Sequence, residues 1–408
     1  MDIESIRKDF PMLQGKTMQQ KPLIYFDNSA TTFKPKSVIN AMVSYLSDYT
    51  ANAHRGDYDL SYKVDVQYEL SREKIQRFIN AKNIEEIVFT YGTTDGLNLI
   101  AFGYALDYLK AGDEILISVL EHASNTLPWF EIARITGAVI KYIDLDEQGA
   151  ITIDNVKKAI TDKTKLIALA HISNVMGYIT PIKEITHYAH LYDILVVVDA
   201  AQSSPHIPID VIDLDCDFMV FSAHKMCGPT GVGVLYGKID LLNQTSPSRY
   251  GGGANARYET SGISYLKKPP YKFEAGTPNI EGAIGLGAAV DYLNNLGMKA
   301  IMDHEIELRH YAITKMKQLD NIILYNPNSK IGPITFNIKN IFAQDAASLF
   351  NTHGIAVRSG QHCAKLLDQY LDITTTIRIS FYLYNTKEEI DKFIEVCKKG
   401  DDFLDAFF

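Results

Sequence analysis

Residues 194–199 read ILVVVD, five apolar residues followed by an aspartate. A run that is apolar at every position and rich in β-branched residues is typical of a strand buried on both faces. Such strands belong to parallel sheets that helices cover on both sides. We therefore interpret ILVVVD as a central strand of such a sheet, with Asp199 at its carboxyl end.

The chain on both sides of this strand repeats the pattern. Strand-like runs alternate with helix-length segments such as 94–110 and 182–192, and the runs are IVFT (87–90), EILIS (114–118), VIKYI (139–143) and KLIALA (165–170). Crossovers of a dozen or more residues favour parallel pairing. Two later runs, DFMVFS (217–222) and GVGVLYG (231–237), are joined by a short Gly-rich connection, which predicts a hairpin or an edge strand.

A second, smaller α+β unit begins near residue 298. Helical patterns over 281–297 and 299–319 lead into it, and its strand-like runs are ITFNI (334–338), IAVRS (355–359) and TIRISF (376–381), with a last helix from Lys387. Residues 246–278 are rich in Gly, Ser and Pro and are expected to form a long irregular loop. We find no linker between the two units, so we expect them to pack together.

Composition excludes several classes of protein. The 408 residues hold 40 Lys and Arg against 49 Asp and Glu, a net charge of −9, which argues against nucleic-acid binding. No run approaches the ~18 apolar residues of a membrane helix, and the first residues do not resemble a signal peptide. The four cysteines (Cys216, Cys227, Cys363 and Cys397) are far apart. This spacing favours a cytoplasmic protein and argues against disulfides and a cysteine metal site.

Two charged residues stand at predicted strand ends. A buried carboxylate such as Asp199 needs a cationic partner, although it could instead cap the segment AAQSS that follows. In FSAHKMCGPTGVG, the strand 217–222 brings Ser222, His224 and Lys225 to the same edge of the sheet. A lysine there is a candidate Schiff-base amine, because burial lowers its pKa, and the alternative is a solvated surface charge.

Two further motifs follow predicted strands. GTTDG (92–96) opens a helix, so its glycine, the hydroxyls of Thr93 and Thr94 and the free N–H groups suit a phosphate; a simple helix cap is the alternative. His122 follows EILIS and could stack on a flat ring or move protons, or be an ordinary loop histidine. An anion site, a stacking partner, a carboxylate and an amine together match the needs of pyridoxal phosphate.

Nearly the whole chain, from YFDNSATT (25–32) to RISFYLYNT (378–386), resembles a known family. The most specific motifs are VVVDAAQSS (196–204), FSAHKMCGPTGVG (221–233), FEAGTPN (273–279) and AVRSGQHCA (356–364). They resemble the class V group of fold-type I pyridoxal-phosphate enzymes, and within it the cysteine desulfurases of the SufS/CsdA type. This resemblance implies a large domain over 26–297 with a mostly parallel seven-stranded sheet, and a small α+β domain from 1–25 and 298–408.

The resemblance also implies a role for each matching residue. It implies that Lys225 forms the Schiff base, Asp199 pairs with the pyridinium nitrogen, Gln202 meets the phenolic oxygen, and His122 stacks on the ring and shuttles protons. The matching phosphate-binding residues are Thr93, Thr94, Ser222 and His224, with Thr277 reaching across from a second subunit of a homodimer. Asn174 and Arg378 match the residues that hold the substrate carboxylate, and His54 and Arg55 of ANAHRG (51–56) are expected at the pocket mouth.

Cys363 matches the nucleophile that takes sulfur from L-cysteine as a persulfide and leaves L-alanine. We expect Arg358, His362 and Lys365 to favour its thiolate, the reactive form. The alternative for Cys363 is a small buried packing residue, which the polar setting QHCAK disfavours. Packing is the expected role of Cys227.

Some positions depart from the family pattern. Gln361-His362 replaces two histidines, KLLD (365–368) replaces a Pro-Leu-Met ending, and Gln344 replaces the histidine of members that use a zinc-bearing acceptor. These departures leave open whether the sulfur acceptor is SufE-like or SufU-like, and we lean towards SufE-like. The alternative functions are a selenocysteine lyase or cysteine sulfinate desulfinase of the same fold, and a non-catalytic sulfur-assembly protein.

Overall fold

A seven-stranded sheet forms the centre of the computed structural model, which describes residues 1–54 and 56–399. The strands are β4 (Ile87–Thr90), β5 (Glu114–Ser118), β6 (Val139–Ile143), β7 (Thr164–Ala170), β8 (Leu195–Asp199), β9 (Phe218–Ser222) and β10 (Gly233–Gly237). Their order is β4-β10-β9-β8-β7-β5-β6, and all neighbours pair in parallel except β10 with β4 and β9. The predicted α/β fold with a mostly parallel sheet is confirmed.

The place of β10 differs from the prediction of an edge strand. β10 does pair with the preceding β9, but its other side pairs with β4, so that Gly233 lies opposite both Thr90 and Ser222. The edge strand on this side of the sheet is therefore β4, and β6 is the edge strand on the other side. The order of the chain gives no sign of this, because β4 lies far upstream of β10.

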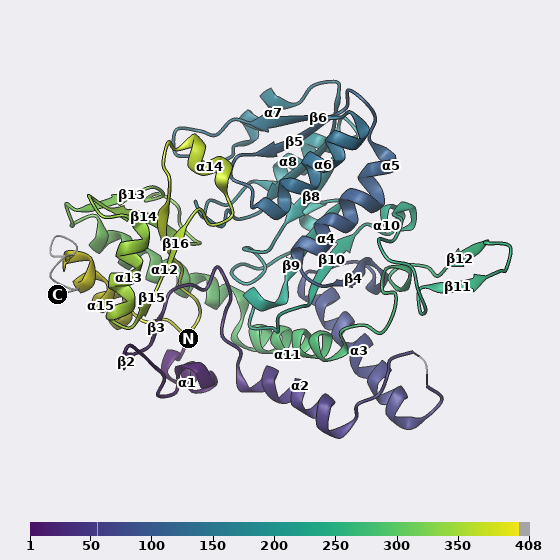
Figure 1. Ribbon diagram of the computed structural model, residues 1–408, viewed down its shortest axis with the longest axis horizontal. Coiled ribbons are helices and arrows are strands. Elements are labelled where there is room, and N and C mark those ends of the chain that lie inside the picture. The colour runs from purple at the N-terminus through teal and green to yellow at the C-terminus, as the bar shows by residue number, and fades with distance from the viewer. Residues whose placement is uncertain (55, 400–408) are drawn as a thin grey trace.

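Helices cover both faces of the sheet (Figure 1). Alternate side chains of β5 enter opposite cores, with Ile115 and Ile117 on one side and Leu116 on the other. Burial on both sides explains why these strands are apolar at nearly every position. One core includes α4 (Thr93–Ile100) and α6 (Leu127–Thr136), and the other includes α2 (Lys36–Asp48), α3 (Asp59–Phe78), α7 (Ile153–Ala159), α8 (Ile182–His190) and α11 (Ile280–Leu296).

A separate core lies in the C-terminal part of the chain. Its antiparallel sheet has the order β13-β14-β17-β16, formed by β13 (Ile322–Leu324), β14 (Ile334–Ile338), β16 (Arg358–Gly360) and β17 (Thr376–Ile379). The helices α12 (Met298–Met316), α13 (Ala343–Thr352) and α15 (Lys387–Lys398) accompany it, and β3 (Ile24–Tyr25) pairs with β15 (Ile355–Ala356). The N-terminal Ile24 and Phe26 join this core. The division at residues 25/26 and 297/298 stays a prediction.

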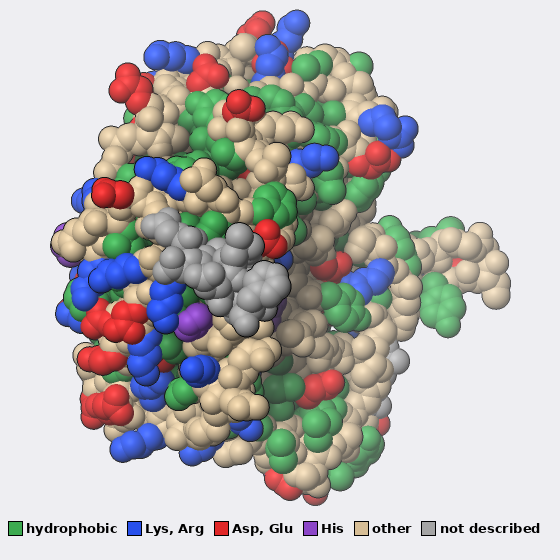
Figure 2. Space-filling view, turned by 60° about the vertical axis from the view of Figure 1, so that its left-hand side comes forward, with side chains coloured by type: hydrophobic (Ala, Val, Ile, Leu, Met, Phe, Trp, Pro, Cys, Tyr) green, Lys and Arg blue, Asp and Glu red, His purple; other side chains and the backbone are tan. Residues whose placement is uncertain are grey.

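We expected the segment 246–278 to be a long irregular loop, and this prediction is only partly right. The segment contains an antiparallel hairpin, β11 (Asn255–Tyr258) and β12 (Ser264–Leu266), which projects from the molecule in Figures 1 and 2. Most of its side chains are exposed, so the sequence lacks the alternating apolar pattern of a half-buried strand. Shorter elements elsewhere are α1 (Ile3–Lys8), β1 (Thr17–Met18), β2 (Lys21–Pro22), α5 (Leu106–Tyr108), α9 (Val211–Leu214), α10 (Ile239–Gln244) and α14 (Lys365–Tyr370).

Over residues 1–54 and 56–399, no helix combines the length and the apolar character needed to cross a membrane. On the face shown in Figure 2, Lys and Arg side chains lie among Asp and Glu side chains. That mixture is the usual surface of a globular protein.

Candidate active site

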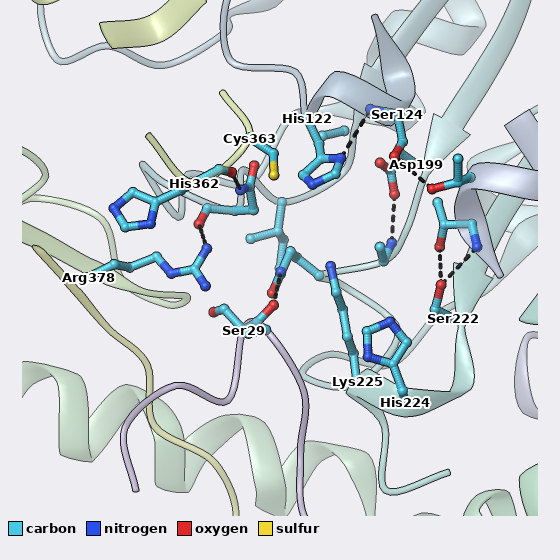
Figure 3. Close-up of a pocket in the computed structure, with 18 of the residues that line it drawn as sticks. Ser29, His122, Ser124, Asp199, Ser222, His224, Lys225, His362, Cys363 and Arg378 are labelled. Atoms are coloured by element: carbon cyan, nitrogen blue, oxygen red, sulfur yellow. Dashed lines mark hydrogen bonds between the residues drawn. The ribbon is translucent and has the colours of Figure 1, made fainter. Parts of the chain in front are cut away.

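A cavity of about 240 Å³ lies at the carboxyl ends of the parallel strands. Figure 3 shows its side chains converging from several strand ends and from the C-terminal part of the chain. The structure brings most of the predicted site residues to its wall, namely Thr93, Thr94, His122, Asn174, Asp199, Gln202, Ser222, His224, Lys225, Cys363 and Arg378. Such a crevice is where open α/β sheets bind ligands.

Asp199 and Lys225 enter the cavity from neighbouring strands. Asp199 ends β8 and accepts a hydrogen bond from the backbone N–H of Ala201 at 2.9 Å. Its burial raises the pKa of the carboxyl group, and the nearby Lys225 opposes this shift. The carboxylate thus has the cationic neighbour that we expected as well as a local backbone donor.

Lys225 is carried by a short 3-10 turn (Ala223–Lys225) that directly follows β9. Burial lowers the pKa of its amine to about 8, and Asp199 opposes the shift. A substantial fraction of the amine is therefore neutral near physiological pH, as a nucleophilic lysine requires. This location fits a Schiff-base lysine better than a solvated surface charge.

The start of α4 and its surroundings form an anion site. Gly92, just before α4, has φ +146, a conformation that L side chains rarely adopt. The backbone N–H of Thr93 donates to Ser222 Oγ at 2.8 Å. The Thr93 side-chain oxygen, Oγ1, lies 2.7 Å from the same Ser222 Oγ. The hydroxyls of Thr94 and Ser124 are likewise 2.7 Å apart. Four hydroxyls at a helix N-terminus suit a phosphate group.

His122 faces the cavity as a neutral imidazole. Burial, and next the charge of Lys225, lower its pKa to about 4. Its Nδ1 accepts a hydrogen bond from the backbone N–H of Ser124 at 3.1 Å, which places the ring proton on Nε2. A neutral ring can lie against a flat ligand and can donate that proton.

Arg378 lies on β17 and is 3 % exposed. Its Nη1 donates to the carbonyl of Asn174 at 2.9 Å and its Nη2 to Asp27 Oδ1 at 3.3 Å, whereas its buried Nε has no partner within the protein. Burial lowers the pKa of the guanidinium to about 10, so it stays charged near neutral pH. A partly satisfied guanidinium of this kind suits the carboxylate of an amino acid.

Cys363 is an exposed residue on the turn before α14. His362 and Cys363 have φ values of +49° and +57°, two successive left-handed residues. Asn174 Nδ2 donates to the carbonyl of His362 at 2.9 Å, and the backbone N–H of Ala123 donates to that of Cys363 at 2.7 Å. The turn that carries the thiol is therefore held from two sides.

The expectation that His362 helps to form the thiolate is wrong. Its ring is buried, its Nε2 lies 2.9 Å from Thr376 Oγ1, and burial lowers its pKa to about 3. It is neutral at physiological pH and supplies no positive charge. Three cations, Arg358, Lys225 and Arg378, line the cavity together with Cys363. Lys365 lines a second cavity that Cys363 also borders.

Cys363 also lines a second, outer cavity of about 540 Å³. Its apolar wall comes from Leu127, Phe130 and Leu366, and Arg358 and Lys365 add positive charge at its border. The thiol therefore has access to two cavities, one that contains Lys225 and one that does not.

Two predicted residues lie away from this cavity. His54 Nε2 is 3.4 Å from Glu69 Oε1, and the His54 ring is 5.6 Å from the ring of Tyr271. Thr277 is exposed and follows Glu274, whose side chain is 7 % exposed. Arg72 of α3 fixes Glu274 with bonds of 2.7 and 2.8 Å. Arg55 lies outside the described residues. One chain alone does not place His54 or Thr277 at the pocket mouth.

Three residues of the site were missed by the sequence reasoning: Ser29 and Ser124, which line the cavity, and Asp27, which is bonded to Arg378. Gln202 Nε2 donates to the carbonyl of Ser29 at 2.9 Å, while Gln202 Oε1 and Ser29 Oγ are buried without a partner. Ser29 and Asp27 belong to the motif YFDNSATT, which would have directed attention to them. Ser124 gave no signal except its position two residues after His122.

These groups fit pyridoxal phosphate. The hydroxyls at the start of α4 would bind its phosphate, and Asp199 would pair with its pyridinium nitrogen. His122 would lie against its ring, and the Lys225 amine would bond to its aldehyde carbon. The unpaired Gln202 Oε1 would accept a hydrogen bond from a ring hydroxyl, or the amide could turn so that its NH2 group donates one. Among residues 1–54 and 56–399, no three His, Cys, Asp or Glu side chains are grouped to hold a metal ion.

Comparisons with known proteins agree with this geometry. The Aminotransferase class-V family matches residues 24–393. A probable cysteine desulfurase of Halalkalibacterium halodurans is 45 % identical over the full length of both chains. The crystal structure of the Escherichia coli cysteine desulfurase CsdA has a TM-score of 0.91 and 34 % identity, covering 99 % of each chain. An apo cysteine desulfurase from Thermococcus onnurineus has a TM-score of 0.92 and 38 % identity, covering 97 % of each.

The pKa of Lys225 predicts how the cofactor-free protein captures pyridoxal phosphate. Only the neutral amine adds to an aldehyde. The rate constant of covalent capture, followed by visible absorbance in a stopped-flow instrument, should therefore rise with pH, reach half of its maximum at about pH 8 and level off above that midpoint. Asp199→Asn removes the charge that opposes the shift and should move the midpoint to lower pH. A midpoint near 10.5, the ordinary lysine value, would contradict this account.

Proposed function

Because the chain belongs to the class-V aminotransferase family, we propose that it converts L-cysteine to L-alanine and holds the released sulfur as a persulfide on Cys363. Its relatives and structural neighbours are cysteine desulfurases, and pyridoxal phosphate is the cofactor. The observation that carries the assignment of Cys363 is that its side chain lines the same cavity as Lys225 and Asp199. The proposed destination of the sulfur is iron–sulfur cluster assembly.

The substrate is held through its carboxylate. Arg378 offers a charged guanidinium whose Nε lacks a partner, and Asp27 and the carbonyl of Asn174 fix the orientation of that group. Charge-assisted bonds from a guanidinium to a carboxylate are strong and directional. The same contact serves any L-amino acid, so the choice of L-cysteine depends on the thiol that it meets, Cys363.

Two residues move protons. When bound, pyridoxal phosphate withdraws electrons from the substrate Cα and makes its proton acidic. Lys225, displaced by the substrate amine, takes that proton at Nζ as a neutral base. His122 holds a proton on Nε2 and can donate it to the carbon skeleton.

The sulfur transfer balances without an outside oxidant or reductant. The Cys363 thiolate attacks the substrate sulfur, so that an S–S bond forms while the Cβ–S bond breaks. The electron pair of that bond stays on carbon, which takes up a proton to complete alanine. The transferred sulfur is oxidised and the carbon reduced, and L-cysteine plus the enzyme thiol become L-alanine plus the enzyme persulfide.

Replacing Cys363 tests this function. Cys363→Ser keeps Lys225 and Arg378, so it should bind cofactor and L-cysteine with unchanged spectral response, while alanine and sulfide production falls to background because serine cannot accept sulfur. Wild-type protein treated with L-cysteine should gain the mass of one sulfur atom on the peptide that contains Cys363.

Cys227→Ala provides the matched control, since Cys227 lies two residues from Lys225 and is fully buried. It should retain turnover. Undiminished alanine production in Cys363→Ser would remove Cys363 from the mechanism.

We also infer a homodimer. Ile39, Val43 and Leu46 form an apolar row along the outside of α2 and are 39, 53 and 57 % exposed, and Tyr62 and Val66 of α3 are exposed as well. Contiguous apolar surface of this kind usually marks an interface. His54 contacts Glu69 of α3, and Thr277 follows Glu274, which is bonded to Arg72 of α3. A second copy docked against α2 and α3 would therefore bring His54 and Thr277 towards its partner's pocket.

Leu46→Glu should convert the dimer to a monomer in sedimentation velocity and weaken retention of pyridoxal phosphate, because Thr277 is then withdrawn from the partner's phosphate site. Leu191→Glu is the control, since Leu191 is 66 % exposed beside α8. A wild-type monomer with full cofactor occupancy would overturn the proposal.

The acceptor proposal rests on how firmly Cys363 is held. β16, α14 and β17 occupy much of the chain between Arg358 and Arg378, so the thiol has little reach even at ~3.3–3.6 Å per extended residue. The acceptor must therefore approach the outer cavity. Gln344, exposed at the start of α13, stands where zinc-dependent members carry histidine, which favours a SufE-like acceptor. Four free cysteines suit a cytoplasmic location for this exchange.

Steady-state alanine release should be slow with L-cysteine alone and strongly stimulated by a SufE-like protein, because persulfide removal limits turnover. A SufU-like protein and a high concentration of small thiol serve as comparisons. Full-speed turnover without any acceptor would contradict the reach argument, and stimulation by the SufU-like protein alone would reverse the preference for a SufE-like partner.

A further inference from the structure

The carboxyl group of Glu121 takes no part in the chemistry derived above, although it directly precedes His122. Glu121 is 2 % exposed. Its Oε1 accepts from Ser118 Oγ at 2.7 Å, and its Oε2 accepts from Asn125 Nδ2 at 2.7 Å and from the backbone N–H of Ala170 at 2.8 Å. A buried acid with three donors is a costly arrangement, so its position calls for an explanation.

The three donors come from three different parts of the fold. Ser118 ends β5, Ala170 ends the neighbouring β7, and Asn125 closes the 3-10 turn (Ala123–Asn125) before α6. Ser118 Oγ also accepts from the backbone N–H of Leu120 at 3.1 Å, and Asn125 Oδ1 accepts from Trp129 Nε1 at 3.0 Å. Both ends of the segment 118–125 are thus fastened to one carboxyl group, and His122 lies between them.

We propose that Glu121 is a positioning residue, whose carboxyl group fixes the segment 118–125 to the end of β7 and so sets where the His122 ring lies against the cofactor. The same segment carries Ala123, whose backbone N–H donates to the carbonyl of Cys363 at 2.7 Å. Glu121 therefore acts on the ring-stacking residue and, through one further bond, on the thiol. The proposal rests on the proposed roles of His122 and Cys363.

The surroundings of Glu121 favour the protonated form of its carboxyl group as the form that fixes the segment 118–125. Burial raises the pKa of the carboxyl group to about 8, and Asp199 adds to the shift, while its hydrogen bonds oppose it. Arg358 and Lys365 border the outer cavity that Glu121 also lines. When the acid is protonated, Oε2 still accepts from Asn125 and from the backbone of Ala170. The bond between Oε1 and Ser118 Oγ then reverses its direction, because the proton on Oε1 is donated to the serine oxygen. Glutamine offers the same acceptor and donor in the same shape.

The test uses the holoenzyme and compares Glu121→Ala with Glu121→Gln. The control is Glu114→Ala, since Glu114 is a buried acid at the opposite end of the same strand, β5, where Thr161 Oγ1 donates to it at 2.6 Å. The readouts are kcat and KM for L-cysteine, the visible circular dichroism of the bound cofactor, and the thermal midpoint of unfolding.

Glu121→Ala should lower kcat by about 10–100-fold with KM nearly unchanged, and should alter the visible circular dichroism, because small displacements of catalytic groups are costly. Glu121→Gln should restore both to nearly wild-type values. Glu114→Ala should lower the thermal midpoint and leave kcat and the dichroism intact. This pattern separates positioning from a general loss of stability.

A Glu121→Ala protein that loses only thermal stability, or a Glu121→Gln protein as impaired as Glu121→Ala, would overturn the proposal. If Glu121→Ala does not fold, Asn125→Ala takes its place, because it removes only one of the three donors to Glu121. Asn125→Ala should lower kcat and alter the visible circular dichroism in the same direction as Glu121→Ala, but by less. Wild-type values of kcat and dichroism in Asn125→Ala would also overturn the proposal. If wild-type protein releases no sulfur, the proposed function fails, and the dichroism of the variants still decides the role of Glu121.

Discussion

An amine and a carboxylate, Lys225 and Asp199, line the same pocket, and the rest of the site depends on the electrostatic interaction between them. Each charge alone would be costly to bury, and each offsets the other's shift in pKa. The pair requires that the end of β8 and the turn after β9 stay in fixed register. Parallel pairing provides this, because Asp199 lies opposite Val220, five residues before Lys225.

The parts of the fold that could be predicted are those that local pattern determines. ILVVVD and KLIALA are apolar throughout because both faces are buried, and residues just beyond such strands meet at one sheet edge, which is how Asp199, His122 and Lys225 could be placed together. The hairpin 255–266 was missed because most of its side chains are exposed. His362 was misjudged because sequence adjacency to Cys363 says nothing about the burial that keeps its ring neutral. The places of His54 and Thr277 depend on distant contacts, such as Arg72 with Glu274, that no local motif contains.

Cys363 combines accessibility with a constrained backbone. Successive left-handed residues that are not glycine persist only where their surroundings hold them. Here the side chain of Asn174 and the backbone of Ala123 do so, one from beside Arg378 and the other from beside His122. The turn that carries the thiol is therefore fixed relative to both Arg378 and His122, while Cys363 still borders the outer cavity.

The antiparallel β10 between β4 and β9 has a consequence for the spacing of the site. Its first residue, Gly233, pairs with the last residues of both neighbours, and a Cβ on it would lie 2.6 Å from the Cα of Gly92 and 2.6 Å from the carbonyl oxygen of Phe221. Contact between these bare backbones sets the spacing between the anion-binding hydroxyls of α4 and the strand that presents the amine. A side chain at position 233 would have no room between these two backbones, so any substitution of Gly233 would push the anion site at α4 and the turn that carries Lys225 apart.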